Sequence, residues 1–136
     1  MSAKDFESLQ IVFFDGHCNL CNNFVDFVVR IDQRQNLYVA SLQGDTAKIL
    51  LSQEQIVNLQ SIVFYDKGRV FDRSTAVLYV LSECLWAFKI LKICLIVPKT
   101  LRDFVYGLIA RNRYRWFGRR ETCRLPSEQE KKRFLP

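Results

Sequence analysis

Two cysteines in Cys-x-x-Cys spacing, Cys18 and Cys21, are the residues of this sequence best placed to do chemistry. A strand-like run over residues 11–15 precedes them and an apolar-periodic helix over about 19–33 follows, so they lie where a strand ends and a helix begins. The first turn of a helix presents unpaired N–H groups and the positive end of the helix dipole, and both favour a thiolate over a thiol. Because the thiolate is the nucleophile in disulfide exchange, the pattern predicts a redox dithiol.

The two cysteines are expected to have different roles. Cys18 lies nearer the start of the helix, so we expect it to be the more exposed thiol and to attack a substrate disulfide, after which Cys21 resolves the mixed disulfide. This exchange needs neither an organic cofactor nor a metal. Two other interpretations are half of a zinc site and a pair of buried small hydrophobic residues. A zinc site needs four ligands, and no second cysteine pair of this spacing follows, which disfavours a metal site.

Asp15 and His17 belong to the tight turn that leads into the dithiol. Asp15 is a candidate catalytic acid/base that exchanges a proton with Cys21, or a turn residue whose carboxylate accepts local backbone N–H groups; the Asp-Gly pair favours the turn role. His17 is the only histidine. It is a candidate substrate-binding residue that would stabilise a Cys18 thiolate when charged, or a solvent-facing spacer, which the lack of an orienting partner in sequence favours.

Length and composition indicate one globular domain. The chain has 136 residues and 49% hydrophobic residues, enough for a proper core, and glycine (5) and proline (3) are too scarce for a loop-dominated chain. Five cysteines are an odd number, which excludes a complete disulfide framework. Residues 1–8 contain no apolar signal core, so we predict a cytoplasmic protein with reduced structural thiols.

Strand and helix patterns alternate along the first two thirds of the chain. A strand–helix–strand unit comes first and would pair its strands in parallel. A hairpin that turns at Gly68 and a helix with Ser74 as N-cap follow. The expected strands cover 11–15, 37–42, 61–65 and 69–71, and the expected helices cover about 19–33, a short stretch from 45, and about 75–85. This order predicts a thioredoxin-like α/β fold, with a four-stranded mixed sheet, flanking helices and a C-terminal helical extension.

The extension begins with residues 86–97, which are nearly all apolar apart from Lys89 and Lys92. The stretch is too short and too charged for a membrane span, which takes about 20 apolar residues. We therefore expect a buried helix ended by Pro98 rather than a helix at a membrane surface. A further amphipathic helix would present Leu101, Phe104, Val105, Leu108 and Ile109.

Positive charge is concentrated in residues 99–136, which hold 11 Lys or Arg and 4 Asp or Glu, a net charge of +7. A solvated basic face explains this most simply, and an anionic partner is the alternative. Arginines interleaved with aromatic residues can bind single-stranded nucleic acid, but no nucleic-acid motif frames them, so docking onto the body with arginines pairing acids is favoured. The residues concerned are Arg111, Arg113, Arg115, Arg119, Arg120, Tyr114, Trp116 and Phe117.

The other three cysteines fall into two kinds. Cys84 and Cys94 lie on predicted apolar helices and are expected to be inert packing residues. Cys123, in the basic segment, is a candidate third redox thiol.

Blocks of sequence resemble the thiol-disulfide oxidoreductase DCC family, named for its Asp-Cys-Cys motif. The matching blocks cover 14–21, 73–78, 106–118 and 123–126. Their order over most of the chain makes the resemblance specific. It implies a thioredoxin-like fold and dithiol redox activity, and the family's motif maps onto Asp15, Cys18 and Cys21.

Thioredoxins place a cis-proline before the third strand, where the loop presents backbone to an extended substrate. The corresponding residues 58–61 contain no proline, so a small thiol or one dedicated partner is favoured. In such a fold the helix opened by Ser74 and Thr75 starts near the dithiol. Its pattern resembles the serine at the glutathione-binding helix start of glutathione transferases, which makes Ser74 and Thr75 candidate substrate-binding residues and glutathione a candidate ligand; ordinary N-capping is the favoured alternative.

We therefore predict one domain over residues 1–136, with a core at about 10–85, a helical extension at about 86–120 and a basic tail at about 121–136. Its predicted function is that of a thiol-disulfide oxidoreductase acting on a disulfide or small-thiol substrate, with a cellular reductant that resets the dithiol. The alternative is a binding module in which a redox-sensing or metal-clasping dithiol controls the basic C-terminal surface.

Overall fold

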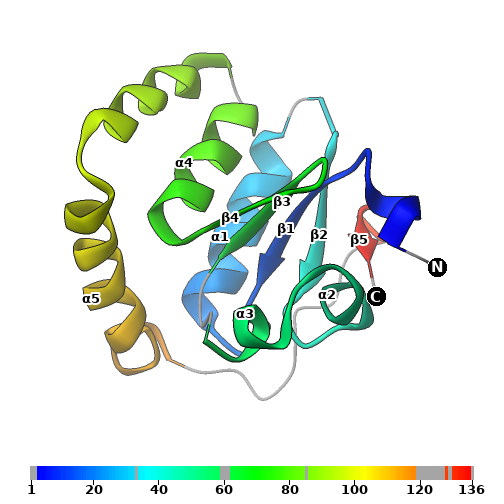
Figure 1. Cartoon of the computed structure of the whole chain (residues 1–136), viewed down its shortest axis with the longest axis horizontal. Coiled ribbons are helices and arrows are strands. Elements are labelled where there is room, and N and C mark those ends of the chain that lie inside the picture. The colour runs from blue at the N-terminus through cyan, green and yellow to red at the C-terminus, as the bar shows by residue number, and fades with distance from the viewer. Residues whose placement is uncertain are drawn as a thin grey trace.

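The computed structural model describes residues 3–32, 34–58, 62–84, 86–118, 128 and 130–135. Within this part of the chain, helices flank a five-stranded mixed sheet (Figure 1). The α-helices are numbered α, the strands β and the 3₁₀ helices η. In chain order the elements are η1 (Ala3–Phe6), β1 (Gln10–Phe14), α1 (Asn19–Ile31), β2 (Leu37–Ser41), α2 (Asp45–Leu50), α3 (Gln53–Asn58), β3 (Val63–Asp66), β4 (Arg69–Asp72), α4 (Arg73–Cys84), η2 (Trp86–Ile96), α5 (Lys99–Phe117) and β5 (Phe134–Leu135).

The strands of the sheet run in the order β4-β3-β1-β2-β5. β1 pairs in parallel with β2 and antiparallel with β3, and β4 is antiparallel to β3. These four strands confirm the predicted thioredoxin-like mixed sheet, with the strand–helix–strand half meeting the hairpin half at β1 and β3. The prediction lacked β5, in which Phe134 and Leu135 pair in parallel with Val39 and Ala40. Two residues are too few to show a strand pattern in sequence.

Both faces of β1 are covered, which explains its unbroken apolar run. Val12 and Phe14 pack in one hydrophobic cluster with residues of α1 and α4. Ile11 and Phe13 pack in a second cluster on the opposite face with residues of η1 and α2. All four side chains are buried. The loop that carries the dithiol therefore leaves a strand that is held on both faces.

The β3–β4 hairpin turns over two residues, Lys67 and Gly68. Both have positive φ, 50° and 94°, as in the type I′ turn that two-residue hairpins favour. The predicted positive φ at Gly68 is confirmed. A lysine with positive φ is uncommon, so the conformation of Lys67 shows how strongly the paired strands dictate the turn.

The start of α4 corrects the predicted cap. The helix begins at Arg73, so Ser74 lies inside the first turn and is not its N-cap. The Ser74 hydroxyl instead donates to the carboxylate of Asp103 on α5 (2.7 Å) and accepts from the guanidinium of Arg102 (3.3 Å). The Ser74 side chain, which the local pattern assigned to capping, therefore bonds to charged groups of α5 instead.

The predicted buried helix over residues 86–97 is wrong for the side chains that the structure describes. The segment forms the 3₁₀ helix η2, and Ile90, Ile93 and Ile96 are 66%, 60% and 82% exposed. A 3₁₀ helix has three residues per turn, so side chains three apart lie along one line, and here that line faces solvent while η2 packs against α4. Cys94, expected to be inert packing, is exposed as well.

α5 forms the outermost layer beside α1 and α4, and η2 and α5 together make an arc around this side of the molecule (Figure 1). The predicted helix is present, but the apolar residues expected to bury it are exposed: Leu101, Phe104, Val105, Leu108 and Ile109. α5 is attached instead through polar contacts along its length, from Arg102 and Asp103 near its start to Arg113 and Tyr114 near its end. In the described residues, no helix has the length and apolar character needed to cross a membrane.

Candidate active site

Cys18 is the N-cap of α1, and Cys21 lies in the first turn of that helix. The Cys18 backbone is extended (φ −94°, ψ 122°), and its sulfur accepts a hydrogen bond from the backbone N–H of Cys21 at 3.4 Å. The buried side chain of Asn22 braces the turn before the helix, because its amide donates to the carbonyls of Gly16 (2.9 Å) and Cys18 (2.8 Å). The prediction that the dithiol lies at a strand–helix junction is confirmed.

The two thiols have different proton affinities. The neighbouring Cys21 thiol lowers the pKa of Cys18 to about 6 against the opposing effect of burial, with help from the Cys21 backbone N–H and the charge of Arg113. The same closeness to Cys18, together with burial, raises the pKa of Cys21. A thiol with a pKa of about 6 is roughly 90% ionised at pH 7. These opposite directions favour a thiolate at Cys18 beside a protonated thiol at Cys21.

Neither sulfur is open at the surface, so the prediction that Cys18 is the more exposed thiol is wrong. Cys18 is 0% exposed and Cys21 is 6% exposed. The reason is the C-terminal end of α5, which lies over the start of α1. The side chain of Asn19 donates to the carbonyl of Phe117 (2.9 Å), and its backbone N–H donates to the carbonyl of Gly118 (3.4 Å). A helix from the far end of the chain thus covers the dithiol.

Asp15 is buried beside the dithiol, and its carboxylate accepts four hydrogen bonds. The backbone N–H of His17 (3.0 Å) and the amide of Gln43 (3.1 Å) donate to Oδ1, and the guanidinium of Arg113 (3.0 Å) and the hydroxyl of Tyr114 donate to Oδ2. Burial alone would raise the pKa of Asp15, but the bonds from Tyr114, His17 and Gln43 and the charge of Arg113 outweigh it and lower the pKa. The bond from His17 is the local turn interaction predicted for Asp15, whereas the bonds to α5 were not predicted.

The sequence patterns named Arg113 only as one of several docking arginines and did not place it at the dithiol. It is 2% exposed and forms a buried ion pair with Asp15. Burial would lower its pKa, but its interactions with Tyr114 and the nearby charge of Asp15 raise it, so the guanidinium stays charged. The expectation that arginines of this segment dock onto the body and pair acids is confirmed for Arg113. The signal that could have pointed to Arg113 was Asp15, because a buried aspartate needs a cation.

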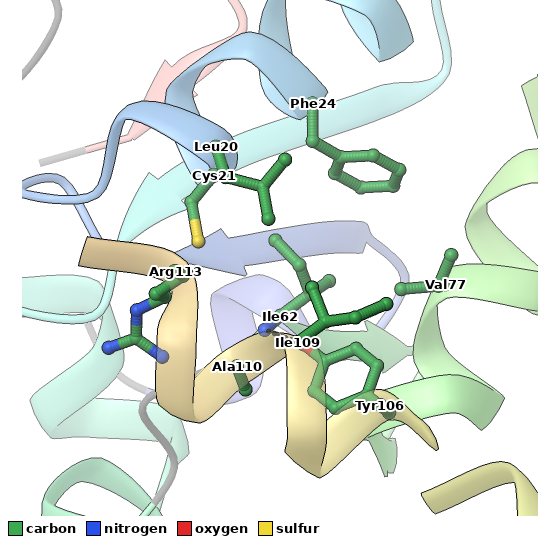
Figure 2. Close-up of a pocket in the computed structure, with 9 residues that line it drawn as sticks. All are labelled: Leu20, Cys21, Phe24, Ile62, Val77, Tyr106, Ile109, Ala110 and Arg113. Atoms are coloured by element: carbon green, nitrogen blue, oxygen red, sulfur yellow. Dashed lines mark hydrogen bonds between the residues drawn. The ribbon is translucent and has the colours of Figure 1, made fainter. Parts of the chain in front are cut away.

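A cavity of about 300 Å³ lies between α1, α4 and α5 and reaches the dithiol at Cys21. Figure 2 shows Cys21 and Arg113 on one side of the view and Val77 and Tyr106 on the other. Apolar side chains form most of its wall: Leu20, Phe24, Ile62, Val77, Ile109 and Ala110. The wall of this cavity is therefore almost entirely apolar, and it meets the dithiol at Cys21.

The three predicted substrate-binding residues lie in different places. His17 is half-buried in the turn directly before Cys18. Ser74 and Thr75 lie in the first turn of α4, where both hydroxyls accept from Arg102 (3.3 and 3.1 Å). Neither residue lines the cavity at Cys21; Ser74 lines a second apolar cavity of about 430 Å³ between α4, η2 and α5. The structure thus brings His17 to the dithiol but ties Ser74 and Thr75 to α5.

The remaining cysteines do not join the dithiol in the part of the chain that is described. Cys84 is buried, and burial raises its pKa to about 12, which agrees with inert packing. Cys123, Arg119 and Arg120 lie outside the described residues. Within the described ranges, no group of three or more His, Cys, Asp or Glu side chains is arranged to hold a metal ion.

Comparison with known proteins supports a redox site. Residues 12–119 match the family model of the DCC1-like thiol-disulfide oxidoreductases. A Bacillus subtilis (strain 168) relative named Uncharacterized protein YuxK is 40% identical over 129 residues, which cover 93% of this chain and 94% of the relative. The DCC family protein At1g52590, chloroplastic, from Arabidopsis thaliana is 36% identical over 118 residues, which cover 85% of this chain and 69% of that protein. No solved structure matches the chain significantly.

Proposed function

Since the chain belongs to the DCC1-like thiol-disulfide oxidoreductase family, we propose that it exchanges disulfides through Cys18 as the attacking thiolate and Cys21 as the resolving thiol. The observation that carries this proposal is the Cys18 sulfur at the N-cap of α1, with its pKa lowered to about 6 beside a protonated Cys21. Attack followed by resolution requires such a pair, because the first sulfur must be ionised while the second waits as a thiol.

In the reducing direction, the Cys18 thiolate attacks one sulfur of a substrate disulfide R–S–S–R′. A Cys18–S bond forms as the substrate S–S bond breaks, and R′S⁻ leaves. Cys21 then gives its proton to the departing thiolate and attacks the Cys18 sulfur, which releases RS⁻. The protein finishes as the Cys18–Cys21 disulfide, two electrons have passed to the substrate, and a cellular dithiol reductant restores the two thiols.

Arg113 and Asp15 act together as positioning residues in this scheme. The charge of Arg113 favours the Cys18 thiolate, and Asp15 holds Arg113 through the buried ion pair at 3.0 Å. A carboxylate with a lowered pKa is a weak base, so we assign the proton of Cys21 to the leaving thiolate rather than to Asp15. We keep His17 as the candidate substrate contact beside the dithiol, while Ser74 and Thr75 would hold α5 in place through Arg102.

Access to Cys18 requires a shift of the C-terminal end of α5. Cys18 has no exposed surface, and the bonds from Asn19 to the carbonyls of Phe117 and Gly118 fix α5 over the start of α1. Both bonds come from one residue, Asn19, and end at Phe117 and Gly118 at the C-terminal end of α5, so the opening can stay local to that end. The cavity at Cys21 would receive the substrate before the cover shifts.

The redox couple is the direct test of the proposed function. Protein equilibrated in glutathione buffers, with its thiols then trapped by alkylation, should show a reversible two-electron Cys18–Cys21 couple between about −270 and −120 mV, the range of exchange enzymes. Cys94→Ser, which replaces an exposed cysteine, should leave the couple unchanged. A folded protein that forms no Cys18–Cys21 disulfide at any ratio of oxidised to reduced glutathione would overturn the proposal.

Alkylation of Cys18 should report its low pKa. We expect the rate with iodoacetamide to rise about tenfold from pH 5 to pH 7 and then to level off, because a thiol with a pKa of about 6 is by then almost fully ionised. Mass spectrometry of the Cys18 peptide gives the rate, and the slow absolute rate of a buried sulfur does not alter the profile. Cys84, with its pKa raised to about 12, is the unreactive internal control. A rate that still climbs above pH 8 would show an ordinary thiol.

A further inference from the structure

Exposed apolar side chains are concentrated on the two outer helices, η2 and α5. Among the described residues, the large hydrophobic side chains exposed outside residues 86–117 are only Phe27 and Ile49. The most exposed of those within this range are Ile90, Ile96 and Phe104. Single exposed hydrophobic side chains are ordinary, but a surface of them that spans two helices marks a site of interaction with a protein or a membrane.

The same helices carry the excess positive charge of the chain. Residues 86–117 contain seven Lys or Arg and one acid, Asp103, whereas the remainder of the chain contains equal numbers of basic and acidic residues. Asp103 accepts from Ser74 and pairs with Lys99, so its charge is already matched. The net charge of +6 and the exposed apolar surface therefore coincide on η2 and α5.

The outer face of α5 places these two kinds of side chain in one row. The row consists of five exposed residues at steps of three and four: Leu101, Phe104, Leu108, Arg111 and Arg115. Tyr106 and Arg113 lie on the opposite side of the helix, where they bond to Ile62 and Asp15. The outward row is thus apolar over its first part and ends with two arginines.

A further cation lies at the other end of the arc formed by η2 and α5. Lys89 is exposed near the start of η2, which ends at Ile96. In the described part of the chain, none of Lys89, Arg111 and Arg115 forms an ion pair with an acid. Figure 1 shows that the arc is convex, so the apolar bend between the two helices projects outward and basic residues lie at both ends.

We propose that the outer face of η2 and α5 binds the surface of an anionic lipid membrane. Ile96 and Phe104 enter the boundary between headgroups and hydrocarbon, and Lys89, Arg111 and Arg115 contact lipid phosphates on either side. The surface helix that the sequence patterns set against a buried helix for residues 86–97 is therefore favoured, because the burial is not observed. This binding surface is separate from the proposed function of the dithiol.

A second copy of the chain fits this face less well than lipid does. In a two-fold contact the same surface meets itself, so the cations of one copy would face the cations of the other. A protein partner is also disfavoured, because the cores of protein interfaces are depleted of charged residues. A lipid surface matches both features, since its phosphates lie directly above hydrocarbon.

Vesicle sedimentation tests the proposal on the full-length, reduced protein. Vesicles of equal parts phosphatidylglycerol and phosphatidylcholine should bind at least tenfold more tightly than vesicles of phosphatidylcholine alone, because each cation at an anionic surface contributes about fivefold in affinity. Raising NaCl from about 50 mM to about 500 mM should weaken the binding, since salt screens exposed charges. Equal affinity for both kinds of vesicle, or no binding to either, would overturn the proposal.

Two variants separate the charges from the apolar contacts. Arg111→Gln/Arg115→Gln should weaken binding to the mixed vesicles at least tenfold. Ile96→Ser/Phe104→Ser should also weaken it at least tenfold, because two exposed apolar side chains can no longer enter the membrane. All four residues are exposed, so circular dichroism should show unchanged helix content. Unchanged binding of the serine variant would show that the attraction is purely electrostatic and that the apolar contact is wrong.

Matched controls lie on the other face of the sheet. η1 and α2 pack in the hydrophobic cluster opposite to that of α4, against which η2 lies. Lys4→Gln/Lys48→Gln removes the same amount of charge from exposed residues of η1 and α2, and Ile49→Ser removes an exposed apolar residue of α2. Both should bind the mixed vesicles as the unchanged protein does. Losses as large as those of the outer-helix variants would show that no particular face binds lipid.

Sedimentation equilibrium without lipid tests the second copy as the occupant. We expect a monomer. A dimer that Ile96→Ser/Phe104→Ser dissociates would assign the face to a second copy and overturn the membrane proposal. Vesicle binding is measured without turnover, so a protein that binds vesicles but forms no Cys18–Cys21 couple would contradict the proposed function alone. A protein with the couple but without vesicle binding would contradict the membrane proposal alone.

Discussion

Cys18→Ser should reduce turnover of 2-hydroxyethyl disulfide by roughly 100-fold or more and leave the fold intact. A serine hydroxyl is not ionised near neutral pH, so it cannot replace the thiolate that this position holds through its lowered pKa of about 6. Serine is also a preferred N-cap, and its hydroxyl can accept the Cys21 N–H that the sulfur now accepts at 3.4 Å. Turnover is measured with a dithiol reductant, and circular dichroism checks the helix content.

Cys21→Ser should give a different product, because attack remains and resolution is lost. A mixed disulfide between Cys18 and the substrate should accumulate to one equivalent per protein, detected by intact mass and assigned by peptide mapping. Cys84→Ala, at a buried cysteine away from the dithiol, is the matched control and should retain turnover. Accumulation of the adduct on Cys21 in Cys18→Ser would reverse the two roles.

Arg113→Met should lower the free energy of unfolding by about 3–5 kcal/mol at pH 7, the cost of leaving a buried carboxylate without its cation. Asp15 and Arg113 are both buried, and their 3.0 Å contact joins the turn before α1 to α5. Methionine keeps most of the apolar stem of arginine, so the change in the free energy of unfolding reports the removal of the charge. Urea unfolding gives the free energies, and Asp15→Asn/Arg113→Met should recover at least half of the loss because it also removes the unpaired charge.

The pH dependence of this loss has a defined sign. The pKa of Asp15 is lowered in the folded protein, so its paired charge stabilises the fold above the unfolded value of about 3.9 and this stabilisation disappears as the pH falls. In Arg113→Met, protonation of Asp15 removes the unpaired charge, so the loss should be smaller at pH 4 than at pH 7. Arg111→Met changes an exposed arginine of the same helix and should stay within about 0.5 kcal/mol. Equal losses at both pH values would show that the ion pair is not the cause.

The sheet and the position of the dithiol could be predicted because they depend on short-range patterns. The apolar run from Ile11 to Phe14, the helical spacing that follows, and Gly68 in its turn each fix a local conformation. The order of those elements then limits the topology to few choices. The partner of Asp15 could not be found in this way, because Arg113 lies 98 residues further along the chain.

The burial of Cys18 escaped prediction for the same reason. A helix start predicts an exposed sulfur, and only the docking of α5 covers it. The outer helices show the reverse case: periodicity identified the apolar residues of α5 and η2, but it could not tell whether another element covers them. Ile96 at 82% exposure and the ring of Phe104 at 64% are apolar residues that nothing in the described chain covers.

The separation of Asp15 from Arg113 also has a consequence for biosynthesis. The segment with Asp15 and the dithiol leaves the ribosome first, and Arg113 of α5 follows Asp15 98 residues later. At about 5–20 residues per second, roughly 5–20 s pass between the two. During that interval the nascent chain presents two uncovered cysteines, and Cys18 lacks the cation that favours its thiolate in the finished protein. The newly made protein therefore passes through a brief period in which oxidants reach its thiols freely, and this period ends when α5 docks.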